Sequence, residues 1–232
     1  MKKLIIILIA LSFVAVAVCL AGNNGNRAVI ARRNIVTPAG VAYVGGAIAS
    51  DAGSPVEATY ASTAGNLLVA GCFGYNTDLP ITFAISDSEA QGWTAGTLIT
   101  DAGEDYYMQF FYKENSASVS TVTCTVTNPG GTMRTVVAEF SGIATSSSYE
   151  DGANATATGN DPQSGNFTVT TGDLIVGLCY GSTAISADSG TMGPTDNVMG
   201  ISYEIIAGTT ANTDFASGWG VWMVVAGGFL PD

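Results

Sequence analysis

The sequence AGNLLVAGCFGY at Ala64–Tyr75 returns as TGDLIVGLCYGS at Thr171–Ser182, 107 residues further along the chain. Each copy places a Gly turn before a run of apolar and β-branched residues, which is typical of a buried strand. Shorter matches follow in the same order, pairing Met108–Tyr112 with Met199–Tyr203 and Val136–Ala138 with Val224–Ala226. We therefore expect two copies of a β unit of about four or five strands that share one core.

Short strands separated by turns continue through the rest of the chain. In Thr121–Val126, threonines alternate with Val122, Cys124 and Val126, so this strand has one buried and one solvated face. We expect strands at Tyr43–Ala49, Val56–Ala61, Asn66–Tyr75, Ile81–Ile85, Tyr106–Lys113, Ser120–Thr127, Arg134–Phe140, Phe167–Thr170, Asp173–Tyr180, Val198–Ile206, Thr213–Ser217 and Val221–Ala226. The predicted fold class is all-β, a jelly-roll-like antiparallel β-sandwich built from two pseudo-repeated halves.

Four segments carry a resemblance to a known kind of domain: Ala64–Val69, Ser86–Thr94, Val136–Gly142 and Thr171–Val176. Together they resemble a jelly-roll-like β-sandwich module that recurs in secreted and surface proteins of bacteria, some of them virus-encoded. The resemblance covers the chain from about Val41 to Phe229 and brings no catalytic residues with it. It implies export and a role in adhesion, glycan contact or surface assembly.

The N-terminus has the layout of a secretory signal peptide. Lys2 and Lys3 precede the uncharged apolar run Leu4–Val18, which ends in the small-residue tripeptide Cys19-Leu20-Ala21. We therefore divide the chain into a signal peptide (1–21), an N-terminal extension (22–40) and a β-sandwich domain (41–232), and expect a secreted or cell-surface protein. Two alternatives stay open, an uncleaved membrane anchor and a lipid-bearing Cys19, and both attach the protein to a membrane through this segment.

Charge and composition exclude several functional classes. Seven Lys and Arg stand against 19 Asp and Glu, a formal net charge of −12, so nucleic acid is not expected as a partner. The sequence contains no histidine, which excludes Ser-His-Asp and Cys-His nucleophiles, zinc sites that use imidazole and a histidine pH switch. An enzyme built on this chain would have to rely on carboxylates.

Three cysteines remain after signal cleavage, Cys72, Cys124 and Cys179, so at least one thiol is free or pairs with another chain. Cys72 and Cys179 occupy equivalent strand positions in the two copies and are the candidate disulfide, with buried free thiols as the alternative. Cys124 shares an apolar strand face with Val122 and Val126 and is expected in the core. The spacing of the cysteines is not that of a metal-binding motif.

Glu139 and Glu204 lie in expected strands and are the candidates for acid–base chemistry. Two carboxylates that project from a sheet into one cleft would suit a glycoside hydrolase. Neither residue belongs to a glycosidase motif, and strand carboxylates also discourage aggregation between sheets. Catalysis by this pair therefore requires that both side chains line one cleft.

Acidic residues also cluster in the expected loops, for example at Glu150–Asp151 and Asn160–Asp161. Calcium favours such oxygen-rich loops, but none of them has the alternating spacing of a dedicated calcium loop. We therefore predict no cofactor and no metal site, and leave a structural calcium ion open.

Exposed aromatic side chains are the candidate ligand-binding surface, because sugars stack their apolar faces on aromatic rings. Trp93 and Tyr149 lie in expected turns, and Trp219 lies three residues before Trp222 in an expected strand, on the opposite face. These three residues, Trp93, Trp219 and Tyr149, are the candidates for such contacts, with burial in the core as the alternative.

These observations predict an exported, non-catalytic binding or adhesion module whose partner is a polysaccharide or cell-surface glycan. The first alternative is a self-assembling surface or virion protein, in which the basic segment Arg27–Arg33 docks on an acidic neighbour and builds a homo-oligomer. The second alternative is a glycoside hydrolase that uses Glu139 and Glu204.

Overall fold

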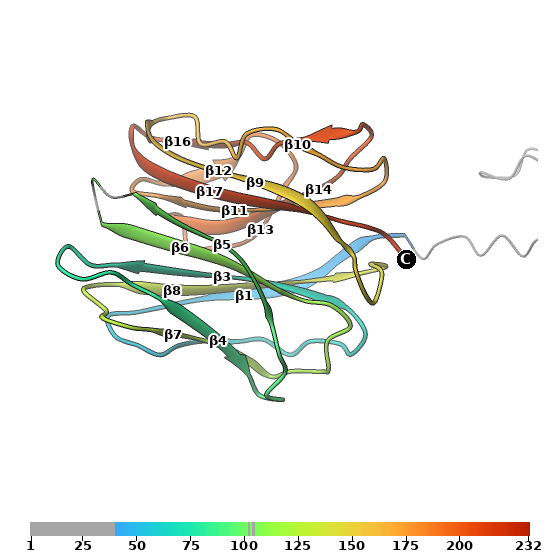
Figure 1. Cartoon of the computed structure of the whole chain (residues 1–232), viewed down its shortest axis with the longest axis horizontal. Coiled ribbons are helices and arrows are strands. Elements are labelled where there is room, and N and C mark those ends of the chain that lie inside the picture. Colours follow the sequence, from blue (N-terminus) through green and yellow to red (C-terminus); the bar gives the residue numbers. More distant parts are fainter. Residues whose placement is uncertain (1–39, 102, 104) are drawn as a thin grey trace, which may run out of the picture. The chain divides into compact units, whose positions relative to one another are not determined.

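The computed structural model describes residues 40–101, 103 and 105–232, and the regular secondary structure within them is β-strand throughout (Figure 1). No helix of these residues is long and apolar enough to cross a membrane. The predicted signal peptide (1–21) and, apart from Gly40, the predicted extension (22–40) lie outside the described residues. The first strand begins at Ala42, close to the expected start of the domain.

The first half of the domain contains β1 (Ala42–Asp51), β2 (Val56–Thr59), β3 (Leu67–Tyr75), β4 (Phe83–Asp87), β5 (Thr94–Asp101), β6 (Tyr106–Lys113), β7 (Thr121–Val126) and β8 (Met133–Ser141). They form a five-stranded sheet in the order β1-β8-β3-β6-β5 and a three-stranded sheet in the order β2-β7-β4. The chain crosses from one sheet to the other at nearly every connection, which is the topology of a jelly roll.

The second half contains β9 (Tyr149–Gly159), β10 (Phe167–Thr168), β11 (Leu174–Gly181), β12 (Ile185–Ala187), β13 (Thr191–Thr195), β14 (Met199–Ile205), β15 (Thr210–Ala211), β16 (Phe215–Ser217) and β17 (Gly220–Phe229). Its five-stranded sheet has the order β9-β17-β11-β14-β13, which matches the first half strand for strand. Two short ribbons, β10-β15 and β12-β16, replace the three-stranded sheet, so that β15 and β16 together stand where β7 stands in the first half.

The two five-stranded sheets pack face to face, and each half carries its smaller sheet or ribbons on the outside (Figure 1). Strand alternation assigns the side chains to these layers. On β3, Leu67, Val69 and Phe73 enter the central core between the large sheets. Leu68, Ala70 and Cys72 point the other way, into the core beneath the three-stranded sheet. The predicted β-sandwich fold and its two repeated halves are thus confirmed.

Equivalent residues of the two halves meet at the centre of the molecule. Phe73 stacks on Tyr180, 107 positions later, with ring centroids 3.8 Å apart. Leu178 fills the space opposite its equivalent Gly71, where an added Cβ would lie 2.5 Å from a Leu178 methyl carbon. At one flank β1 lies against β13, and at the other flank β9 lies against β5. These contacts are equivalent, because β9 corresponds to β1 and β13 corresponds to β5. The halves are therefore related by a pseudo-twofold axis between β3 and β11.

Each copy is larger than the sequence indicated. The predicted unit had about four or five strands, whereas each half forms a complete sandwich with eight strand positions. The strands absent from the prediction are β5, β9, β12, β13 and β15. Three of them, β5, β9 and β13, are edge strands of the large sheets, and they are rich in Thr, Ala and Gly rather than in alternating large apolar residues.

Candidate functional site

Glu139 is an internal anchor. It lies on β8 with no exposed surface, and its carboxylate accepts hydrogen bonds from the Tyr60 hydroxyl (2.6 Å), the Thr63 backbone amide (2.9 Å) and the Asn66 side-chain amide (2.5 Å). All three donors belong to the connection between β2 and β3. A buried carboxylate with three donors is well compensated, and it fixes this loop against the sheet.

Glu204 lies on the opposite side of the molecule. It is on β14, facing the outer ribbons beside Ser189 and Thr213, and burial followed by the nearby Asp214 raises its pKa. Both large sheets separate it from Glu139, because Glu139 faces the outer layer of the first half. The two carboxylates do not share a cleft, so they do not form the paired arrangement that a glycoside hydrolase needs.

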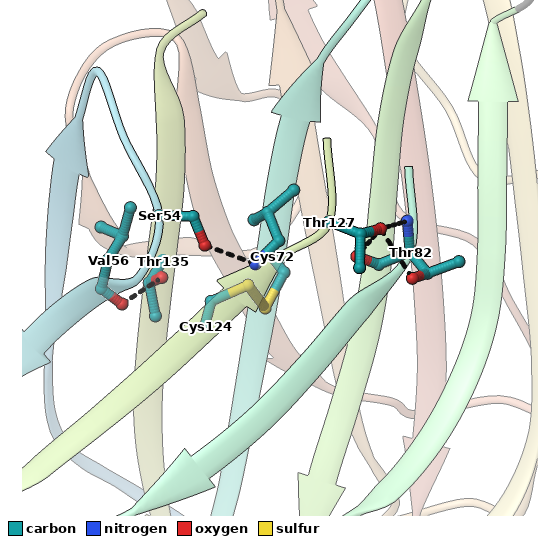
Figure 2. Close-up of a disulfide and its surroundings, with 8 residues drawn as sticks. Ser54, Val56, Cys72, Thr82, Cys124, Thr127 and Thr135 are labelled. Carbon is teal, nitrogen blue, oxygen red and sulfur yellow. Dashed lines mark hydrogen bonds between the residues drawn. A yellow bond between two sulfur atoms is a disulfide. The ribbon is translucent and has the colours of Figure 1, made fainter. Parts of the chain in front are cut away.

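The disulfide joins Cys72 to Cys124 and not to Cys179 (Figure 2). The predicted Cys72–Cys179 pair is therefore wrong, and strand alternation gives the reason. Both residues point away from the central interface, Cys72 into the outer core of the first half and Cys179 into that of the second. Cys124 on β7 faces Cys72 directly, whereas Cys179 is a buried free thiol whose pKa is raised by burial.

Two further hydrogen bonds lie near the disulfide (Figure 2). Thr135 of β8 donates through its hydroxyl to the Val56 carbonyl of β2 at 3.0 Å. The Val126 amide of β7 donates to the Ser54 hydroxyl at 2.7 Å. The disulfide and the Thr135 bond thus link the large and small sheets of the first half, and the Ser54 bond holds the β1–β2 connection against the small sheet.

Trp93 is also a structural residue. Its ring packs against the outer core of the first half, and its indole N–H donates to Asp87 Oδ2 at 2.7 Å. The other oxygen of Asp87 accepts the backbone amides of Glu89 and Gln91, so one carboxylate orders the whole turn that precedes β5. Trp93 therefore has little free surface for a ligand.

Tyr149 belongs to one of two equivalent aromatic groups. It stacks on Tyr112 with centroids 5.2 Å apart, and Phe229 packs edge-on against both rings. The same arrangement recurs at the other flank, where Tyr43 stacks on Tyr203 at 4.8 Å beside Phe140. Each group takes one tyrosine from either half. The sequence repeat showed that Tyr112 corresponds to Tyr203, but it did not show that they stack on Tyr149 and Tyr43.

A small cavity of about 270 Å³ opens beside the second aromatic group. Its lining is mainly apolar, with Val41, Tyr43, Leu174 and Ile205, but Glu204 also contributes to it. Burial and the neighbouring Tyr203 raise the pKa of Tyr43, so its hydroxyl is neutral at physiological pH. The cavity offers contact area between the halves and few polar groups with which to orient a ligand.

Trp219 differs from the other candidates because 75% of its surface is exposed. It lies in the turn between β16 and β17, and a neighbouring loop braces both sides of this turn. Ser182 exchanges two hydrogen bonds with Val221, at 2.9 and 3.0 Å, and the Thr183 hydroxyl donates to the Gly218 carbonyl at 3.0 Å. The ring is therefore held out into solvent on a fixed backbone.

In the second half, an unexpected pair of carboxyl groups, Asp173 and Glu150, occupies the place that corresponds to the Asn66–Glu139 contact of the first half. Asp173 is the equivalent of Asn66 and is fully buried. The Thr170 amide donates to both Asp173 Oδ2 (2.7 Å) and Glu150 Oε2 (3.0 Å), so the two carboxyl groups share one donor. Burial, followed by the hydrogen bond with Glu150, raises the pKa of Asp173 to about 6. Asp173 Oδ1 is buried without a hydrogen-bond partner, which also favours the neutral, protonated form of this carboxyl group.

Among the described residues, no group of three or more Asp, Glu, His or Cys side chains is arranged to hold a metal ion. Glu150 and Asp151 accept hydrogen bonds from backbone amides around Thr168 and Thr170, so their oxygens already have partners within the protein. Comparison with family models, with curated proteins and with solved structures found no match.

Proposed function

We propose that this protein is an exported, non-catalytic binding module that contacts a glycan or another cell-surface polymer through Trp219. The observation that carries the proposal is the exposure of this indole ring on a braced turn. Aromatic rings bind sugars by stacking on the C–H face of a pyranose, and a ring that is already fixed loses little conformational entropy on binding.

The packing of the halves supports a binding surface on the loops. A jelly roll has two kinds of surface to offer, the faces of its sheets and the turns at its ends. Here the large sheets cover one another, and the smaller layers cover their outer faces. Ser182 and Asn160 are exposed beside the Trp219 turn and supply polar groups next to the ring.

The arrangement of the carboxylates favours binding over catalysis. Glu139 is buried beneath a loop, and Glu204 faces a different layer. Catalysis by a carboxylate pair requires two groups on either side of one scissile bond. This geometry supports the non-catalytic proposal and gives no support to the hydrolase alternative.

The test is a binding assay with purified Gly22–Asp232 against a panel of soluble and insoluble polysaccharides, in which depletion of protein and release of reducing ends are both measured. We expect depletion without sugar release, and quenching or a blue shift of indole fluorescence on binding. Trp219→Ala should weaken binding at least tenfold, which corresponds to about 1.4 kcal/mol.

Leu98→Ala is the matched control, because Leu98 is an exposed apolar residue on β5. It should bind as the unmodified protein does. Equal losses in the two variants, or binding that survives Trp219→Ala, would contradict a role for the indole ring. Release of reducing ends would instead show a hydrolase, and absence of binding across the panel would remove the glycan proposal.

A further inference from the structure

The four edges of the large sheets are not protected equally. Exposed edges invite other strands, and proteins block them with bulges, prolines or charges. A register shift interrupts β1 between Tyr43 and Gly45, and another interrupts β5 between Ala95 and Leu98. β13 has both a register shift and Pro194. The shifts in β5 and β13 interrupt these strands along their length, whereas the shift in β1 lies at its N-terminal end and leaves Gly45–Asp51 in unbroken register.

β9 has the longest uninterrupted edge of the four, because its own register shift and its two charged residues, Glu150 and Asp151, lie at its N-terminal end. From Gly152 to Gly159 it pairs with β17 in unbroken register, and this stretch contains neither a charged residue nor a proline. Asn154, Ala157 and Thr158 are exposed. Among the described residues, the side of Ala153–Gly159 that faces away from β17 has no backbone partner. β9 can therefore accept an additional strand.

The charges at the ends of β9 select the chemistry of that strand. Glu150 and Asp151 are exposed at its start, and Asp161 is exposed just beyond its end. Antiparallel pairing of β9 with the β9 of a second copy would bring these acidic ends together, and like charges across a strand pair are destabilising. A basic, extended segment would meet the opposite charge at both ends.

This chain carries such a segment. Five of its seven cations lie in residues 1–39, which contain no acid, whereas residues 40–232 hold the other two cations and all 19 acids, a net charge of −17. Arg27–Val36 reads RAVIARRNIV and combines three arginines with β-branched residues. At about 3.3 Å per residue it is about 30 Å long when extended, enough to cover the open stretch of β9.

The positions of the sheet edges favour a second copy over the same chain. β9 lies against β5, which is at the edge of its sheet farthest from β1. The added strand would lie one spacing beyond β9 and in the other sheet layer, about 24 Å across the sheet and about 10 Å above it, or about 26 Å from β1, whereas the six Cα steps from Val36 to Ala42 span at most about 22 Å. We propose that Arg27–Val36 of one copy adds as a sixth strand to the β9 edge of another, so that the chains associate head to tail.

The experiment is sedimentation velocity of Gly22–Asp232 over a range of protein concentrations at low and high salt. We expect association that increases with concentration and weakens with salt, because the ion pairs at the ends of β9 are solvent-exposed. Ala157→Lys, which places a charge on the open edge, should weaken association at least tenfold. Ala84→Lys is the matched control on an exposed strand of the outer layer and should have no effect.

Mixing two variants tests whether the contact joins the N-terminal segment of one copy to the β9 edge of another. The triple variant Arg27→Glu/Arg32→Glu/Arg33→Glu should be monomeric, as should Ala157→Lys, but a mixture of the two should form a one-to-one complex. Each partner then supplies the element that the other has lost. A monomer under all conditions, a mixture that stays monomeric, or association that Ala157→Lys leaves unchanged would overturn the proposal. If Ala157→Lys abolished association and the arginine variant did not, the result would show pairing between two β9 strands instead.

Discussion

The two halves share one topology but are held together differently. In the first half the outer layer is a continuous three-stranded sheet, joined to the large sheet by the Cys72–Cys124 disulfide. In the second half it is split into two ribbons of two or three residues per strand, and Cys179 packs against Phe215 and Trp222 instead of a second thiol. The comparison shows that a jelly roll tolerates a broken outer sheet when aromatic side chains fill the layer beneath it.

The halves have also become complementary where they touch. An exact repeat would place two glycines or two leucines opposite each other at the pseudo-twofold axis. The first choice would leave a void and the second would crowd the core. Gly71 and Leu178 avoid both results, since one supplies the space that the other fills. Neither half could replace the other at this interface without a change in packing.

The largest expected effect comes from this position. Leu178→Gly should lower the free energy of unfolding by about 4 kcal/mol, because it leaves a cavity and adds a flexible residue to a buried strand. Gly71→Leu alone should cost about 1–3 kcal/mol by overpacking. The double variant moves the leucine across the axis and should recover most of the lost stability in urea unfolding. A double variant less stable than both single ones would contradict the pseudo-twofold packing.

Removal of the disulfide should make the first half resemble the second. The bond closes a loop of 52 residues, for which the chain-entropy model gives a stabilisation of about 4 kcal/mol. Cys72→Ala/Cys124→Ala should therefore lower the free energy of unfolding by about 2–4 kcal/mol. Hydrogen exchange of β4 and β7 should then rise toward that of β12 and β16.

Cys179→Ala is the control, because it removes a buried thiol without removing a cross-link. It should leave exchange in β4 and β7 unchanged, and a reducing agent should still destabilise this variant. Unaltered protection of β4 and β7 after loss of the disulfide would show that the bond does not set the stability of the outer layer. In the unmodified protein, alkylation without reduction should label Cys179 and only after denaturation.

The sequence was informative where strands are buried on both faces and uninformative at the sheet edges. β3 and β11 are continuous apolar runs, so their bounds were predicted to within a residue. β9 and β13 were missed because small and polar residues suffice on a strand with exposed surface and give no apolar alternation. The strand prediction therefore omitted β5, β9 and β13, three of the four edge strands of the large sheets.

The candidate site shows the same limit. Alternation within Thr121–Val126 correctly placed Cys124 on a buried face, but it could not reveal which layer that face meets. Equivalence of Cys72 and Cys179 suggested a bond, whereas the halves associate through the opposite faces of those strands. Long-range packing, which single-strand patterns do not encode, also decided that Trp93 is held by Asp87 while Trp219 is exposed.

The smallest expected effect tests a position where the halves differ by an ionisable group. Asn66 donates to Glu139, whereas its equivalent Asp173 meets the carboxyl group of Glu150. Because the folded pKa of Asp173, about 6, lies above its unfolded value of 3.8, its stabilising contribution is present below pH 4 and is lost as pH rises through 6. Asp173→Asn should be as stable as the unmodified protein at pH 4 and more stable by about 1 kcal/mol at pH 7.

The reciprocal Asn66→Asp should introduce the same pH dependence into the first half by placing a second acid beside Glu139. Thermal unfolding of the three proteins at both pH values measures these differences, and a gap between Asp173→Asn and the unmodified protein that does not change with pH would contradict a raised pKa at Asp173.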